Sequence, residues 1–427
     1  MISSKQLDTG SLFARLQTIS SKRLMRYILL FGFLLRLAFL GIYGDLKNDY
    51  YWEYGEISKN LVHGKGYSFF SIDGDSTIDR YRPNAEAFKS AFMPPGYVLF
   101  LAPYLTVENL TLRNILLLLT HLLFSTATIW LLYRVCTTFF SETVGLVAAG
   151  IGAVLPEFLY ANLSFTPTVL YHFLILYLFL LIAKMGEGGW RIPMIGLVLG
   201  VLMYLRAEFV LFTALFLPIL LFRKEIGRAL LIGAIAFGAI LPWSVRNINT
   251  FNAFVPLTTG FGLNLYRGHN PHYVGNFGFD EVAGALKDVR DDQYEVVMSK
   301  EYQKLAVSYI KEHPGEVASN SILKFFWFFS YIPFYPESGN LLYLLPTIGL
   351  FLLSLYGVIR TFSWRRYWHF YLFFFTSTVV VVLFFPLPRY QTMMKILQLP
   401  FAAYGLLLLL SIWRKKERPE LANNPER

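Results

Sequence analysis

Runs of apolar residues long enough to cross a lipid bilayer recur along almost the whole chain. A hydrocarbon core about 30 Å thick needs roughly 20 apolar residues in a helix. Ten runs approach or reach that length. They cover about residues 24–43, 111–133, 143–162, 165–184, 192–207, 208–222, 228–245, 341–360, 367–386 and 391–413. Two shorter runs, 93–106 and 323–336, indicate half-spans or interfacial helices. Because backbone groups in lipid must be hydrogen-bonded internally, the sequence predicts an all-α polytopic membrane protein with about 10–12 transmembrane helices and external loops.

The positions of the basic residues predict how the chain is oriented. Lys22, Arg23 and Arg26 precede the first run, and Arg223 with Lys224 lies in a later gap. This is the positive-inside pattern, so the net charge of +10 reports topology and not a nucleic-acid partner. The first run is too long for a signal-peptide core and lacks a small-residue cleavage site, which favours a retained anchor. We expect a multi-pass protein of the plasma (inner) membrane with both termini in the cytoplasm.

This topology divides the chain into four parts. Residues 1–245 form an N-terminal transmembrane module that contains the first external loop, 44–110. Residues 246–322 form an external loop region, residues 323–413 the C-terminal transmembrane helices, and residues 414–427 a cytoplasmic tail. Cys136 is the only cysteine, so no intramolecular disulfide and no structural zinc site of cysteines is expected. The external parts must be held by packing.

The first external loop concentrates charge next to aromatic residues. Between residues 44 and 68 it contains four carboxylates: Asp45, Asp49, Glu53 and Glu56. The pattern predicts a helix from Asp49 to Val62, on which three- and four-residue spacing places Asp49, Glu53 and Glu56 on one face. Such a helix would lie flat in the membrane interface with its aromatic residues toward lipid. Spacing alone leaves two interpretations open, a solvated polar face or a set of carboxylates directed into a cavity.

Four segments together resemble a known family. They are DYYWEYGEISKNLVHGKGYS after the first run, FMPPGYVLFLAP, LPWSVRNINTFNAFVPLTTGFGLNLYRGHNP after the middle runs, and YIKEHPGEV before the last group. In this order and on one predicted side of the membrane, they are similar to glycosyltransferase family 39. That family includes the protein O-mannosyltransferases and the lipid A aminoarabinose transferases, within the C-type membrane glycosyltransferases. The similarity covers nearly the whole chain.

The resemblance implies a reaction and a catalytic group. A sugar carried on a polyprenyl phosphate would be transferred, on the external face, to a hydroxyl of a glycan, lipid or protein acceptor. An acidic residue in the first external loop would act as the catalytic base, because the acceptor hydroxyl must lose its proton as it attacks. Asp49 matches that position best, followed by Asp45 and Glu53. The sequence departs from the family pattern here, since the position counted back from Tyr54 holds Tyr50, one residue after Asp49.

The leaving phosphate is a dianion, which arginine binds through two parallel hydrogen bonds. The candidates for this role are Arg246, Arg389, Arg206 and Arg82. An arginine at a helix end also commonly extends to the interface without binding a ligand, so both interpretations stay open. The residues expected to contact substrate are Tyr54, Glu56, Tyr97, Asn264 and Tyr390. No metal-ligand spacing occurs among the histidines, so no cofactor is expected, and a divalent metal is left open.

Two other classes of protein share this composition. A lipid or glycan flippase or transporter would also be polytopic, but it typically has paired halves and ionisable residues near mid-membrane. A non-catalytic subunit for glycan assembly could keep the fold and lack the base. The expected partners are a polyprenyl-phosphate sugar donor, an acceptor and membrane lipids.

Overall fold

The computed structural model describes residues 20–74, 76–272 and 280–417, and this part of the chain is mainly helical. Its strands, β1 (Ser71–Asp73) and β2 (Ser76–Ile78), pair as an antiparallel hairpin. Six of the described helices are long and apolar enough to cross a membrane. They are α2 (Ser21–Tyr43), α5 (Leu110–Phe139), α11 (Ile226–Phe251), α16 (Leu341–Thr361), α17 (Trp364–Leu383) and α18 (Pro388–Glu417), the last with an apolar part that ends at Trp413.

The other four predicted runs form shorter apolar helices. These are α6 (Glu142–Val154), α8 (Thr168–Ala183), α9 (Arg191–Leu205) and α10 (Phe209–Phe222). Pro156 ends the run after α6 and begins the short α7 (Pro156–Tyr160), because proline disrupts a helix interior but fits its first turn. All ten runs are therefore helical, and the predicted all-α polytopic fold class is confirmed.

The two shorter runs form partial helices, as predicted. One is α4 (Pro95–Leu105). The other is the end of α15 (Pro314–Phe328), after which the chain is irregular until the 3₁₀ helix η1 (Pro336–Gly339). The external loop region contains α12 (Phe261–Gly268), α13 (Asp280–Leu286) and α14 (Tyr294–Glu312). Pro314 separates α14 from α15, because proline interrupts one helix and fits the first turn of the next.

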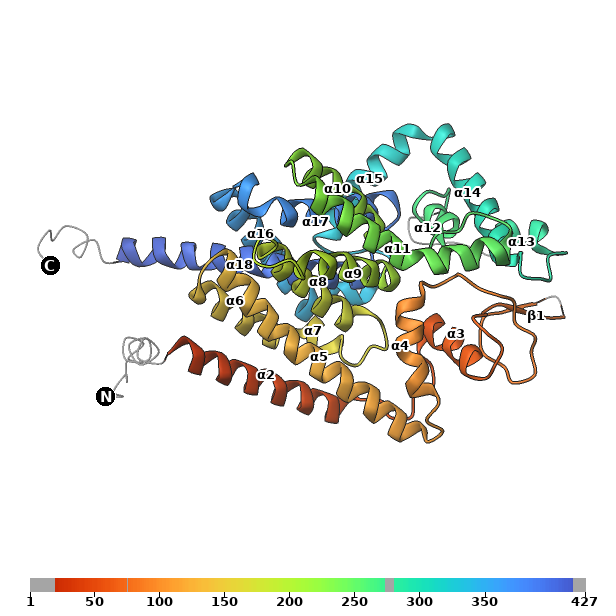
Figure 1. The fold of residues 1–427 in the computed structure, drawn as a ribbon, viewed down its shortest axis with the longest axis horizontal. Coiled ribbons are helices and arrows are strands. Elements are labelled where there is room, and N and C mark those ends of the chain that lie inside the picture. Colours follow the sequence, from red (N-terminus) through yellow and green to blue (C-terminus); the bar gives the residue numbers. More distant parts are fainter. Residues whose placement is uncertain (1–19, 75, 273–279, 418–427) are drawn as a thin grey trace, which may run out of the picture.

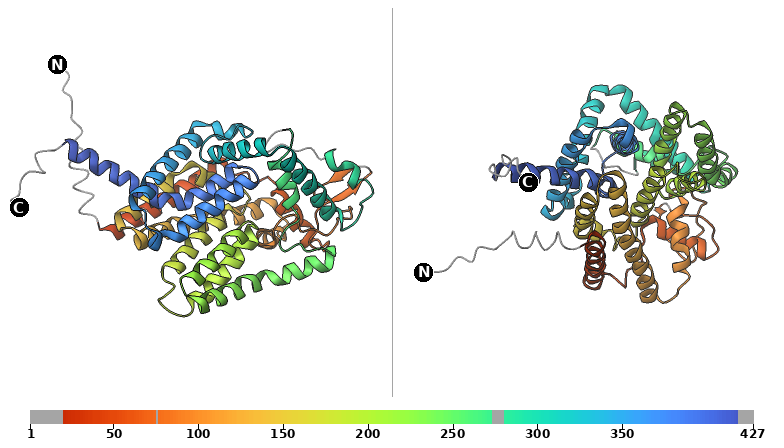
Figure 2. Two further views of the ribbon diagram at one scale, coloured as in Figure 1. Left: turned by 90° about the horizontal axis from the view of Figure 1, so that it is seen from above. Right: turned by 60° about the vertical axis from the view of Figure 1, so that its left-hand side comes forward.

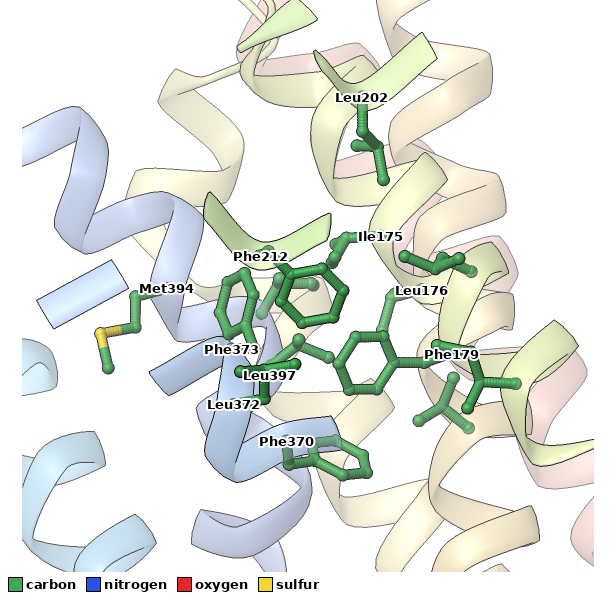
Figure 3. Close-up of a cluster of buried hydrophobic side chains, with 14 of the residues drawn as sticks. Ile175, Leu176, Phe179, Leu202, Phe212, Phe370, Leu372, Phe373, Met394 and Leu397 are labelled. Carbon is green, nitrogen blue, oxygen red and sulfur yellow. The ribbon is translucent and has the colours of Figure 1, made fainter. Parts of the chain in front are cut away.

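The helices form an elongated bundle with distinct ends. Figure 1 shows that α2 begins and α18 ends at one end of the bundle, while α3 (Trp52–Val62), β1 and α12–α14 lie at the other. Figure 2 shows α18 passing through the middle of the C-terminal helices. Every residue of α18 from 391 to 403 is buried. Its neighbours include a cluster of aromatic and aliphatic side chains in which Phe212, Phe373 and Leu397 take part (Figure 3).

Arg36 is buried inside the bundle although it lies in the first membrane span. Its guanidinium donates to the carbonyl oxygens of Ala153 (2.8 Å) and Gly152 (3.0 Å) and to the Ser125 hydroxyl (2.7 Å). Carbonyls in the last turn of a helix have no partner within that helix, so Arg36 of α2 caps the end of α6.

The helix in the first external loop begins later than predicted. It starts at Trp52 and not at Asp49, so Asp49 lies outside its first turn. The side chain of Asp45 accepts from the amide of Lys47, and that of Asn48 accepts from the amide of Tyr50, each 2.9 Å away. Such local side-chain bonds offer the backbone an alternative to the helix. The face that carries Glu56 is also buried, so the helix does not present a solvated polar face.

Glu295 joins the external loop region to the segment before α4. Its carboxylate accepts from the amide of Ala91 (2.9 Å) and the hydroxyl of Thr259 (2.8 Å), and the side chain is buried. Burial raises the pKa of Glu295 to about 7, although these hydrogen bonds and the charge of Arg246 act to lower it. Glu295 therefore holds two external segments together with a carboxyl group that titrates near neutral pH.

The orientation of the bundle can be tested by labelling cysteines. In a Cys136→Ala background, we expect Ser76→Cys and Asp288→Cys to react with a membrane-impermeant maleimide in intact cells. Both positions are exposed and lie in the predicted external parts. Glu187→Cys, equally exposed in the predicted cytoplasmic loop between α8 and α9, should react only after lysis. Protection of position 76 or 288 in intact cells would contradict the predicted topology.

The stability of the purified protein should depend on the protonation of Glu295. Because folding raises the pKa of this carboxyl, the free energy of unfolding should fall as pH rises from about 4.5 to about 7 and then level off. The shift in the pKa of Glu295 corresponds to a change on the order of 3 kcal/mol in the free energy of unfolding over this pH range. Glu295→Gln, which keeps an oxygen acceptor for Ala91 and Thr259, should lose this slope in thermal unfolding measured between pH 4.5 and 8. An unchanged slope in the variant would show that another group titrates.

Candidate active site

Helix α3 is fixed against α4 and α5 by buried contacts. The ring of Tyr54 meets the ring of Tyr97 edge to face, with centroids 5.3 Å apart. The hydroxyl of Ser58 donates to the carbonyl of Val98 (3.1 Å), and the hydroxyl of Tyr51 donates to the side chain of Asn114 (2.6 Å). These contacts determine which of the four carboxylates of the loop face the protein and which face the solvent.

Three of the four carboxylates are engaged in local structure. Asp45 forms the turn described above. Asp49 forms ion pairs with Arg113 (3.0 Å) and Lys59 (3.2 Å) and thereby links the loop to α5. Glu56 is buried and accepts from Lys59 (3.1 Å) and from the amide of Tyr81 (2.5 Å). In the structure, these three carboxylates therefore stabilise the conformation of the loop.

Glu53 is the carboxylate that faces a group of arginines. Its side chain is half-buried, and within residues 20–74, 76–272 and 280–417 it forms no hydrogen bond or ion pair. Its charge acts on Tyr54, on Arg267 of α12 and on Arg389 of α18. Glu53 therefore lies within the electrostatic range of cations that come from two distant parts of the sequence.

Arg206 completes the group from the corner between α9 and α10. It is buried and its Nε donates to Glu208 (2.6 Å), while its guanidinium lies 4.7 Å from the centroid of the Tyr390 ring. Burial is the largest influence on the pKa of Arg206 and would lower it, but the charge and hydrogen bond of Glu208, together with Tyr390 and Tyr54, raise it overall. Arg206 therefore stays protonated, and its charge is partly balanced by Glu208.

Arg389 and Arg267 are held differently. Arg389, in the first turn of α18, is exposed, and the part of the chain that the structure describes gives it no carboxylate or carbonyl within hydrogen-bond distance. Its guanidinium lies 5.6 Å from the Tyr390 ring centroid. Arg267, in the last turn of α12, lies 4.5 Å from the centroid of Phe385. Burial lowers the pKa of Arg267, and the positive charge of Arg389 lowers it further.

The segment after Arg267 is packed tightly against the corner between α17 and α18. A side-chain carbon at Gly268 would approach the carbonyl oxygen of Phe384 too closely, so only glycine fits there. The next residue, His269, hydrogen-bonds the carbonyl of Leu383 through Nε2 (2.8 Å). Arg267 and Arg389 are thus carried by segments in direct contact.

An apolar cleft adjoins Arg206. Its volume is about 50 Å³, and it follows α17 for about two turns, from Phe373 to Val381. Figure 3 shows Phe212 and Phe373, which are among its lining residues. The lining residues are Tyr171, Arg206, Glu208, Phe209, Phe212, Phe328, Phe373, Thr376, Ser377, Val380, Val381, Tyr390, Met393 and Met394. Most of the lining is apolar, and Arg206 and Glu208 are its charged members.

The other predicted site residues lie elsewhere or have structural partners. Arg246 donates to the carbonyls of Ser90 (2.7 Å) and Tyr67 (3.1 Å), and so joins α11 to the first external loop. Arg82 pairs with Asp73 at the exposed β hairpin (3.1 Å). Tyr97 is buried, with its hydroxyl 3.2 Å from Nε2 of His121. Asn264 is half-buried on α12.

The structure therefore brings together five predicted residues: Glu53, Tyr54, Arg206, Arg389 and Tyr390. It also adds Arg267, which the sequence analysis missed. Arg267 lies in the segment that carries the family resemblance, LYRGHNP, but nothing in the sequence distinguishes it from an arginine at the interface.

The charges of this site suit an anion. Within the described residues, no group of three or more His, Cys, Asp or Glu side chains could hold a metal ion. Glu53 has arginines as its charged neighbours across the site, and a divalent cation placed there would be repelled by them. The residues present do not fit a metal.

No protein-family model matches the sequence, and no curated protein sequence matches it. Several solved structures, however, are similar to this chain. The chain is similar to the archaeal oligosaccharyltransferase AglB from Archaeoglobus fulgidus in complex with an inhibitory peptide and a dolichol-phosphate, with 10% sequence identity and a TM-score of 0.55. The similarity covers 95% of this chain and 52% of that chain. The complex of the A. fulgidus oligosaccharyltransferase with Zn and sulfate gives 11% identity, a TM-score of 0.53, and coverage of 92% and 50%.

The chain also matches ArnT from Cupriavidus metallidurans bound to undecaprenyl phosphate, with 13% identity and a lower TM-score of 0.36. That match covers 89% of this chain and 78% of that chain. The chain spans about half the length of the oligosaccharyltransferase. At these identities the likeness to the oligosaccharyltransferase shows a shared fold.

Proposed function

We propose that this protein is a membrane glycosyltransferase of family 39 that transfers a sugar from a polyprenyl-phosphate donor to an acceptor hydroxyl on the external face of the plasma membrane. One observation carries the proposal. Glu53, a carboxylate with no hydrogen-bonded partner among the described residues, lies within the electrostatic range of Arg267 and Arg389, and the neighbouring Arg206 lines an apolar cleft. AglB, with which the chain shares its fold, has been observed with a dolichol-phosphate.

The cleft and the arginines match the two ends of a polyprenyl phosphate. The isoprenoid chain is apolar and gains free energy when aromatic and aliphatic side chains remove it from water. The phosphate is a dianion, and guanidinium groups bind it through charge-assisted hydrogen bonds. Arg389 has donors available for this purpose, whereas Arg206 already shares its charge with Glu208.

The reaction needs a base at the acceptor. The acceptor oxygen attacks the anomeric carbon while the bond from that carbon to the phosphate oxygen breaks. The acceptor proton passes to the base, and the phosphate leaves with the electron pair toward the arginines. We propose Glu53 for this role in preference to Asp49, because Asp49 is paired with Arg113 and Lys59 and does not begin the helix.

Glu53→Gln should therefore reduce sugar transfer at least about a hundredfold, the lower range for loss of a general base. Because glutamine has nearly the same shape, binding of polyprenyl phosphate to the purified protein should be nearly unchanged. Asp49→Asn, the matched control, breaks a half-exposed ion-pair network and should cost less than about tenfold in turnover.

If Asp49→Asn abolished transfer and Glu53→Gln did not, the base would be Asp49. Normal transfer in both variants would argue against this enzymatic mechanism, and phosphate-lipid binding without any transfer in the unaltered protein would favour a flippase or an assembly subunit.

Arg389→Lys should lower the transfer rate by about a hundredfold, because a point charge does not reproduce the two parallel hydrogen bonds of a guanidinium. Arg246→Lys is the matched control, since Arg246 donates to backbone carbonyls at the same end of the molecule. That variant should lose about 1–2 kcal/mol of stability in thermal unfolding but keep near-normal turnover per folded molecule. Near-normal turnover of Arg389→Lys would mean that Arg389 does not hold the phosphate.

A further inference from the structure

Two exposed aromatic side chains flank the segment that carries Glu53. Tyr50 is 39% exposed and Trp52 is 48% exposed, and their ring centroids lie 5.6 Å apart with the planes at 52°. Between them, Tyr51 is fully buried and packs its ring on Phe165. The chain thus turns alternate aromatic residues out of and into the protein immediately before Glu53.

Trp52 adopts a backbone conformation that is unfavourable for its side chain. Its φ is 58°, in the left-handed region that glycine and asparagine tolerate best. This conformation costs a bulky residue on the order of 1 kcal/mol or more. The turn serves the fold by burying Tyr51, but the exposed indole contributes little to that burial. A tryptophan at this position is therefore not explained by stability.

The two aromatic rings belong to residues next to Glu53 in the chain. The charges that act on Tyr50 are those of Glu53, Asp79, Arg80 and Glu56, and the Arg80 guanidinium lies 5.5 Å from the Tyr50 ring centroid. The charge of Glu53 also acts on Arg267 and Arg389. Glu53 therefore adjoins an aromatic surface and lies within range of the proposed phosphate site.

We propose that Tyr50 and Trp52 form the acceptor subsite of the enzyme and that this subsite binds a sugar ring, so that the acceptor is a carbohydrate. The inference rests on the proposed function, because in a displacement the acceptor enters opposite the leaving phosphate. A base next to the aromatic surface can take the proton of an acceptor hydroxyl held there.

The chemistry of the surface matches a pyranose. One face of such a ring consists of C–H groups and packs on aromatic side chains, whereas its rim carries hydroxyl groups that need hydrogen-bonding partners. Asp79 and Arg80 supply charged partners next to Tyr50. A lipid acceptor, or anchoring of these aromatic residues in the membrane, would require the charged side chains to be desolvated, which is costly.

The proposal can be tested with the purified, full-length protein and simple probes. Saturation-transfer NMR would measure binding of methyl glycosides and a linear hexasaccharide, with a serine-containing peptide and a long-chain alcohol for comparison. We expect the glycosides to bind. Trp52→Asn, which suits the left-handed turn, should weaken their binding about tenfold without lowering the unfolding temperature, and Trp52→Phe should retain most of it. Phe254→Ala, which removes an exposed aromatic residue (79%) outside this surface, is the matched control and should bind normally.

Two outcomes would overturn the proposal: glycoside binding that Trp52→Asn leaves unchanged, or binding of the peptide or the alcohol in place of the glycosides. A large loss of thermal stability in Trp52→Asn would show that the indole is structural. Binding of polyprenyl phosphate is measured separately on the same samples and should be normal in Trp52→Asn. If the unaltered protein did not bind polyprenyl phosphate, the proposed function would fail independently of the carbohydrate subsite.

Discussion

A buried ion pair fixes the central helix of this protein. Nζ of Lys395 lies 2.5 Å from Glu157 and 2.7 Å from the hydroxyl of Thr347, and both charged side chains are almost fully buried. The pair joins α18 to α7 and α16. Removing one member of such a pair leaves an uncompensated charge, which costs about 3–5 kcal/mol. The depth of α18 in the bundle is therefore well determined, and this also fixes the positions of Arg389 and Tyr390, about one and a half turns away.

Arg36 solves the same physical problem in a different way. Hydrocarbon offers a cation no water, so a charge inside the bundle must find protein oxygen atoms. Lys395 pairs with a carboxylate, whereas Arg36 hydrogen-bonds carbonyl groups at the end of α6 that have no partner within that helix. Both solutions connect helices that are distant in sequence. The interior cations thus explain how several short, proline-interrupted helices can keep a definite arrangement.

The sequence predicts the bundle much better than it predicts the site. Membrane thickness favours long apolar runs, so the sequence locates the ten helical runs, although Pro156 divides one of them. The residue at which α3 begins cannot be predicted in this way, because it depends on turns made by Asp45 and Asn48 and on the left-handed backbone of Trp52. Similarly, the sequence places both Arg246 and Arg389 near helix ends. Their tertiary neighbours differ: Arg246 donates to a carbonyl oxygen, whereas Arg389 lies within the electrostatic range of Glu53.

The clustered arginines belong to three pieces of chain: the corner between α9 and α10, the end of α12, and the start of α18. Arg389 repels both Arg206 and Arg267, so the packing of the helices must hold like charges from three segments near one another. A dianion between the three arginines would attract all of them. If the proposed phosphate binds there, its presence would draw the three segments together, and its departure would weaken the contact between them.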